Sequence, residues 1–213
     1  MTGGPSAADG RSGGGTSGAS LIAAAFARFD AINAEDPRSE TISGSRVPQE
    51  LLYARRMSER LADFEAGASE TLRLAARAQH IARWRIPRAD YPAGRKGYRA
   101  WRARLMRLHA EIASEVLTWV GYGEETIATV ARLIRKQGLK RDPDAQTLED
   151  VVCLVFLEHY FEEFSVGHDD AKLVGILRKT WAKMSDRGRA AALGLRLGAR
   201  ARRLIREAAD GNP

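Results

Sequence analysis

The sequence has a single cysteine and no long apolar segment. Because one thiol has no partner within the chain, Cys153 excludes an intramolecular disulfide, and its apolar surroundings favour a buried structural thiol over a reactive one. No apolar run approaches the roughly 18 residues that a membrane span needs. The N-terminus also lacks the charged and then apolar pattern of a signal peptide, so we expect a cytoplasmic protein with no membrane contact.

Strand patterns are also scarce. No alternation of polar and apolar residues extends beyond a few positions, whereas apolar residues recur at helical spacing from residue 48 onward. The chain of 213 residues, 44% of them hydrophobic, is long enough for one sizeable core. We therefore predict an all-α fold with about seven to eight helices. Residues 1–20 are expected to be a disordered Gly/Ser-rich tail, 21–46 a short helix and polar linker, and 47–209 the helical domain.

Turn and capping residues predict several helix boundaries. Gly121 is expected to end a long helix. Pro143 is assigned to a loop, and Thr147 to the cap of the segment "LEDVVCLVFLEHYFEEF". That segment is apolar on nearly all sides, so we expect its helix to be central. Ser185 is predicted to cap a last helix that spans residues 186–209.

Basic residues outnumber acidic ones, 34 against 27, and this balance permits a phosphorylated or nucleic-acid partner. Arginines account for 28 of the basic residues, a skew that genome composition also produces, so the position of the charge is more informative. Nine basic residues interleaved with aromatics lie between residues 83 and 107, opposed by Asp90 alone. Two interpretations are open. The arginines and aromatics could contact the phosphates and bases of a ligand, or they could form a solvated helix face. The candidate ligand contacts are Arg83, Arg85, Arg102, Trp84 and Trp101.

Two histidines and one aspartate are candidate site residues. His80 and His109 each lie on an apolar face beside a basic segment, where a packed core histidine is the ordinary interpretation. Glu149 and Asp150 begin the apolar helix, and capping of that helix is the ordinary interpretation for them. The same position also places a carboxylate at the rim of the core, where a metal or a general base is held in many sites.

Four stretches resemble a known family, called domain of unknown function 4202, over about residues 47 to 192. They are "ELLYARRMSERL", "LAARAQHIARWRIPRADYP", "YRAWRARLMRLHAEIASEVLTWVGY" and "QTLEDVVCLVFLEHYFEEF". More distantly, they are similar to the HD superfamily of helical metal-dependent phosphohydrolases, which implies an HD-domain-like bundle. In that pattern His80 matches the histidine of a His-Asp pair, His109 a further histidine that some members use, and Asp150 an aspartate at the start of a later helix.

The same resemblance assigns two ligand positions to residues that do not suit a metal. Tyr53 stands where the first histidine is expected, and Ile81 where the aspartate of the pair is expected. A divalent ion would then be held by His80, His109 and Asp150, with waters and substrate completing its shell. Further candidates for a rearranged metal site are Glu149 and Glu158.

Three hypotheses follow. The preferred one is a diverged phosphohydrolase for a nucleotide or other phosphoester, in which the two histidines and Asp150 hold a metal and its activated water. The second is a non-catalytic nucleotide- or RNA-binding module that has lost its metal, whose binding weakens steeply with salt. The third is a scaffold without ligand, in which the histidines are packed and hydrogen-bonded. Convergence of His80, His109 and Asp150 on an arginine-lined cavity would favour a site.

Overall fold

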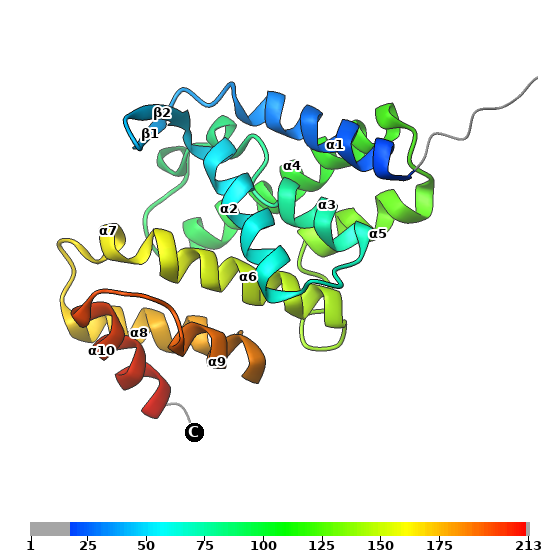
Figure 1. Ribbon diagram of the computed structural model, residues 1–213. Coiled ribbons are helices and arrows are strands. Elements are labelled where there is room, and N and C mark those ends of the chain that lie inside the picture. Colours follow the sequence, from blue (N-terminus) through cyan, green and yellow to red (C-terminus); the bar gives the residue numbers. More distant parts are fainter. Residues whose placement is uncertain (1–17, 212–213) are drawn as a thin grey trace, which may run out of the picture.

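Apolar residues at helical spacing build a succession of helices in the computed structural model, which describes residues 18–211 (Figure 1). The prediction of an all-α fold is confirmed, and the predicted tail falls outside the described residues as far as residue 17. The elements are α1 (Gly18–Asn33), β1 (Ser39–Ile42), β2 (Ser45–Pro48), α2 (Gln49–Phe64), α3 (Glu70–Ala78), the 3-10 turns η1 (Arg83–Arg85) and η2 (Arg88–Asp90), α4 (Gly94–Val120), α5 (Glu124–Ile134), α6 (Pro143–His159), α7 (Phe161–Ser165), α8 (Asp170–Trp181), α9 (Asp186–Leu193) and α10 (Ala199–Asp210).

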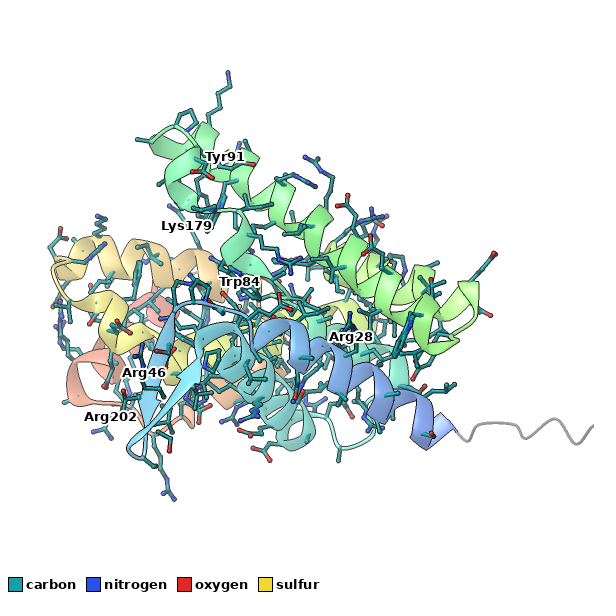
Figure 2. The ribbon with its side chains drawn as sticks, turned by 90° about the horizontal axis from the view of Figure 1, so that it is seen from above. Arg28, Arg46, Trp84, Tyr91, Lys179 and Arg202 are labelled. Atoms are coloured by element: carbon teal, nitrogen blue, oxygen red, sulfur yellow. The ribbon has the colours of Figure 1, made fainter. Side chains whose placement is uncertain are left out.

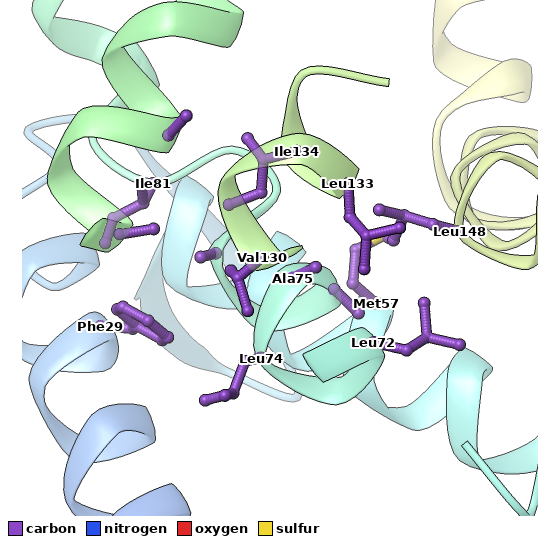
Figure 3. Packing of buried hydrophobic residues seen from close by; sticks show 14 of the residues in the cluster. Phe29, Met57, Leu72, Leu74, Ala75, Ile81, Val130, Leu133, Ile134 and Leu148 are labelled. Carbon is purple, nitrogen blue, oxygen red and sulfur yellow. The ribbon is translucent and has the colours of Figure 1, made fainter. Parts of the chain in front are cut away.

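Two apolar clusters hold these helices together. The larger lies among α1 to α6 and includes the fully buried Phe29, Met57 and Leu133 (Figure 3). The second joins α6 to α8, α9 and α10, and it includes Cys153, which is buried as predicted. In Figure 1 helix α6 runs between the helices of the first cluster and helices α8 to α10, and it contributes side chains to both clusters. The central position predicted from its apolar composition is therefore confirmed. Across residues 18–211 no helix is both long and apolar enough to cross a membrane.

The predicted linker contains a short antiparallel hairpin. Strands β1 and β2 pair with Ser39 opposite Pro48, and the tip residues Ser43 and Gly44 have φ angles of 49° and 83°. Positive φ at both central residues is the conformation of the tight hairpin turns whose twist matches that of the strands. Each strand has only four residues, too few for an alternating pattern to be recognised.

Two helix boundaries differ from the prediction. Helix α6 begins at Pro143 and not near Thr147, because Asp142 caps it by accepting hydrogen bonds from the backbone of residues 144 and 145, and proline suits the first helical position. The last predicted helix is divided into α9 and α10 by a segment flanked by two glycines, residues 194–198. Two other boundaries are confirmed: Gly121 ends α4 with a φ of 102°, and the hydroxyl of Ser185 caps α9.

Candidate functional site

A cavity of about 530 Å³ is lined by side chains from α2, α4, α6 and α8, from the segments between them, and from Arg38 and the adjoining strand β1. Its charged and polar lining includes Arg38, Glu50, Tyr53, His80, Arg83, Arg102, Lys136, Glu149, Tyr160 and Lys183. Apolar and aromatic side chains, among them Tyr98, Trp101 and Phe156, form the rest of the wall. An apolar hollow with several convergent polar groups is typical of small-molecule sites.

His80 lies in the turn after α3, where neighbours on three sides fix its ring. The ring stacks on Tyr53 with centroids 4.0 Å apart, its Nδ1 is 3.7 Å from Glu50 Oε2, and its Nε2 is 3.3 Å from Arg83 Nη1. Because a guanidinium only donates, Nε2 is the acceptor, and Nδ1 carries the proton of the neutral ring. Desolvation, and after it the charge of Arg83, hold the pKa of His80 well below 6.5. His80 is therefore neutral at neutral pH.

His109 lies behind His80 on α4, with ring centroids 5.8 Å apart. Its Nδ1 is 2.7 Å from the carbonyl oxygen of Ile81, so Nδ1–H donates and Nε2 carries a lone pair. This Nε2 is buried and has no hydrogen-bond partner among the described residues. Burial lowers the pKa of His109 to about 3, opposed by the hydrogen bond to Ile81. The site thus contains two neutral histidines side by side.

Glu50 is a functional candidate that the sequence did not reveal. It lies in the first turn of α2, where an acidic residue is ordinary, and its side chain is buried. Arg38 donates to its Oε1 at 3.0 Å, and Arg83 Nε lies 3.8 Å from the same oxygen. Burial raises the pKa of Glu50 from 4.5 to about 7, against the opposing charges of Arg83 and Arg38. A carboxyl that titrates near neutral pH thus faces the neutral His80.

Lys136 and Lys183 supply positive charge at another wall of the cavity. Lys136 has a φ of 57° just after α5, which turns the chain at this point, and its amine pairs with Glu149 of α6. Lys183 approaches the other oxygen of Glu149 at 3.6 Å. Desolvation lowers the pKa of Lys136, and Glu149 opposes that effect. Lys136 was another site residue that the sequence did not mark.

Arg102 is the cation with the least compensation in the cavity wall. No carboxylate oxygen lies within 4 Å of it anywhere in residues 18–211. Its charge contributes to the lowered pKa of both Arg83 and Lys136, after the larger effect of desolvation. Arg83 itself covers the ring of Trp101 at 4.8 Å. Arg102 therefore repels two other cations of the cavity lining, Arg83 and Lys136.

The structure brings together only some of the predicted site residues. His80, Arg83, Arg102 and Trp101 line the cavity, and His109 packs behind the first of them. The side chain of Ile81 lies in the apolar core. The predicted contacts Trp84 and Arg85 are not in the cavity lining (Trp84 is labelled in Figure 2). The guanidinium of Arg85 lies 5.7 Å from the centre of the Trp84 ring. It also pairs with Glu35 at 3.1 Å, and this ion pair satisfies its charge.

Asp150 does not line the cavity, although the sequence placed it beside the histidines. Its carboxylate accepts hydrogen bonds from the backbone N–H and hydroxyl of Ser185 and from Gln146 Nε2 at 3.2 Å, so it secures the start of α9. The neighbouring Glu149 faces the cavity in its place. Glu158 pairs with Arg60 instead.

The donor atoms of the cavity do not fit the divalent metal that the HD resemblance implies. Within residues 18–211 no three histidine, cysteine, aspartate or glutamate side chains are grouped so that they could hold a metal ion. The Nε2 atom of His80 accepts from Arg83, and a second cation at that nitrogen would be repelled by the guanidinium. The lining carries five cationic side chains against four carboxylates, those of Glu40, Glu50, Glu149 and Glu163. Because Arg102 is the cation without a carboxylate partner among the described residues, this small positive surplus suits an anion.

Comparison with known proteins assigns the chain to a family. The model of the family described as Domain of unknown function (DUF4202) matches residues 23–205, and the chain therefore belongs to this family. No curated protein and no solved structure in these comparisons matches the chain.

Proposed function

We propose that the cavity of this DUF4202 family member binds a small phosphorylated molecule with an aromatic body, such as a mononucleotide. The observation that carries the proposal is the uncompensated Arg102, placed among other cations in the lining of the cavity. A phosphate dianion there would accept from the guanidinium and relieve the repulsion between Arg102 and its cationic neighbours.

The remaining cavity wall supports an aromatic body on the ligand. Trp101 and Phe156 line the cavity, and the ring of Tyr98 is 5.8 Å from that of Trp101 and half exposed. Such rings offer stacking surfaces to a planar base. The HD-type resemblance also supports this location, because Tyr53, His80 and His109 occupy positions that it assigned to ligands, and their rings form one continuous group.

Binding has more support than metal-dependent hydrolysis of a phosphoester. Hydrolysis of that kind requires a metal and its activated water, and Asp150, one of the three proposed ligands, is held at the start of α9. A ligand site also has more support than a plain scaffold. Besides His109 Nε2, the hydroxyl of Tyr53 is buried without a hydrogen-bond partner among the described residues.

Calorimetric titration with AMP and UMP at low salt tests the proposal, with adenosine and uridine as ligands that lack the phosphate. Arg102→Gln should weaken binding of the nucleotides roughly 10- to 100-fold, the loss expected for one charged hydrogen bond. Arg107→Gln is the matched control, because Arg107 is an exposed arginine on the same helix outside the cavity lining, and it should bind as the wild type does. Equal affinity for nucleosides and nucleotides, or no effect of Arg102→Gln, would contradict the proposal. Release of phosphate on addition of Mn²⁺ would instead support the hydrolase.

A further inference from the structure

The first turns of α4 form an unusual surface next to the cavity. In Figure 2 this end of the helix projects beyond the rest of the molecule, beside the labelled Tyr91. The preceding loop is packed closely against it, since a Cβ at Gly97 would lie 1.9 Å from the carbonyl oxygen of Pro92. The close contact holds the helix start and its loop as one rigid projection.

A line of polar residues follows one face of this projection. Arg95, Tyr98, Arg99 and Arg102 are spaced at i, i+3, i+4 and i+7, which places them on the same side of a helix over about 10 Å. We call these four residues the α4 stripe. One and two turns further along, the same side of α4 carries the buried Leu105 and His109. The face that packs against the core therefore continues into the stripe, where Tyr98 is 49% exposed.

The charges of the stripe are uncompensated. Among the described residues, no carboxylate lies within 4 Å of Arg95, Arg99 or Arg102. The basic helix α10 differs in part, because Arg200 and Arg203 both pair with Asp170, whereas Arg202 and Arg206 have no carboxylate within 4 Å among the described residues. In the described residues the three arginines of the stripe are thus all without a carboxylate partner, whereas half of the arginines of α10 are paired.

The stripe and the cavity are continuous, because Tyr98 and Arg102 line the cavity as well as the helix face. A mononucleotide would occupy the cavity alone and leave Arg95 and Arg99 unused. A chain of phosphates would meet one cation after another along the helix, and its unpaired bases would find the exposed Tyr98 ring at the cavity mouth for stacking. An acidic peptide offers negative charge but no planar group for that ring.

We infer that the protein binds a single-stranded nucleic acid whose terminal phosphate enters the cavity at Arg102, while the next nucleotides lie along the α4 stripe. The inference rests on the proposed phosphate site and extends it to a class of ligand. It also explains why this side of α4 carries arginines without carboxylate partners at its start, although it is buried further along the helix. Cation contacts of this kind make affinity fall as salt rises.

The test uses fluorescence anisotropy with short oligouridine RNAs that carry a 5′-phosphate, a 3′-phosphate or no terminal phosphate, labelled at the other end. One of the phosphorylated RNAs should bind more tightly than both the unphosphorylated RNA and free UMP. In the variant Arg95→Gln/Arg99→Gln, RNA affinity should fall about tenfold or more, and the slope of log affinity against log salt should shrink by roughly 1.4. Binding of UMP to the same variant should not change.

The matched control is Arg104→Gln/Arg107→Gln, which removes the same charge from the opposite side of α4. It should reduce RNA affinity much less than the stripe variant. Equal losses in both variants, or RNA that binds no more tightly than UMP, would overturn the inference while leaving the cavity proposal intact. RNA binding that ignores the terminal phosphate and Arg102→Gln would overturn the link between stripe and cavity. Failure of UMP to bind would count against the proposed function itself. Tighter binding of a poly-glutamate peptide than of RNA would overturn the choice of ligand class.

Discussion

Glu149 and Asp150 are neighbours on α6, yet they belong to two different polar regions of the interior. At the corner between α6 and α9, the Asp150 carboxylate accepts from two groups of Ser185 and from Gln146. In the cavity, by contrast, Glu149 faces several cations, Glu50 is held near its ionisation point, and polar atoms behind the wall lack partners among the described residues. A saturated polar group indicates a structural role, whereas a group of unsatisfied ones indicates a place for a ligand.

The comparison predicts that Asp150→Ala causes the largest loss of stability. The substitution removes the acceptor of three hydrogen bonds at a site where the side chain is buried, so the free energy of unfolding should fall by roughly 3 to 4 kcal/mol. Urea unfolding monitored by circular dichroism measures this change. Binding of UMP at temperatures where the variant is folded should be unchanged.

Two further variants refine the Asp150 experiment. Asp150→Asn keeps one acceptor oxygen and should cost less than Asp150→Ala. Gly188→Ala should also destabilise, because its Cβ would lie 2.5 Å from Asp150 Oδ1. If Asp150→Ala were as stable as the wild type but lost nucleotide binding, Asp150 would belong to the functional region and the comparison would be wrong.

Glu50→Gln should produce the second largest effect, and it should depend on pH. The folded-state pKa of Glu50 is raised from 4.5 to about 7, so its carboxyl favours folding fully below pH 4.5, and this contribution is lost as the pH rises through 7. Glutamine imitates the protonated form at every pH. The stability of the variant relative to the wild type should therefore increase between pH 4.5 and 7 by up to about 3 kcal/mol.

The measurement is a series of urea unfolding curves at several pH values for both proteins. His109, whose pKa is lowered, acts in the opposite sense: it stabilises the fold above pH 6.5 and loses that effect as the pH falls toward 3. This contribution is present in both proteins and cancels in the difference. A difference in stability that does not vary with pH would show that the pKa of Glu50 is not raised in the folded protein.

Much of the fold was predictable from the sequence because it depends on local patterns. Apolar periodicity, Gly121 and Ser185 gave correct elements and boundaries, whereas the hairpin was missed because its strands are too short for a pattern. The boundary of α6 was misjudged because Pro143 was assigned to a loop, although Asp142 caps the helix just before it.

The site was less predictable because tertiary packing decides it. His80 was a candidate from its place beside the basic segment and from a resemblance, but Glu50 and Lys136 look like ordinary helix-end residues until distant segments meet around them. The choice between Glu149 and Asp150 shows the difficulty most clearly. Successive residues of a helix point about 100° apart, so one position decides whether a carboxylate faces the cavity or the neighbouring helix.

Arg102→Gln should have a moderate and opposite effect on the free protein. Removing this charge relieves its repulsion of Arg83 and Lys136, so the free energy of unfolding without ligand should rise by roughly 0.5 to 1 kcal/mol at low salt. The gain should shrink at high salt, because screening weakens the same repulsion in the wild type. Urea unfolding at two salt concentrations measures it, with Arg107→Gln as the control that should change little. A loss of stability would show that the charge of Arg102 stabilises the free protein and does not await a ligand.

Tyr53→Phe should produce the smallest change in stability. It compares the cavity with the corner between α6 and α9 at the level of a single hydroxyl group. The hydroxyl of Tyr53 is buried without a hydrogen-bond partner among the described residues, so its removal leaves the stacking on His80 intact and relieves a desolvated group. We expect the free protein to be unchanged or more stable by about 0.5 kcal/mol. Ser185→Ala removes a hydroxyl that is satisfied, and it should cost about 1 kcal/mol as the loss of a helix cap. Thermal unfolding of the two variants compares one hydroxyl from each region directly. If Tyr53→Phe destabilised as much as Ser185→Ala, the Tyr53 hydroxyl would already be satisfied in the free protein, and the contrast between a saturated corner and an unsatisfied cavity would fail.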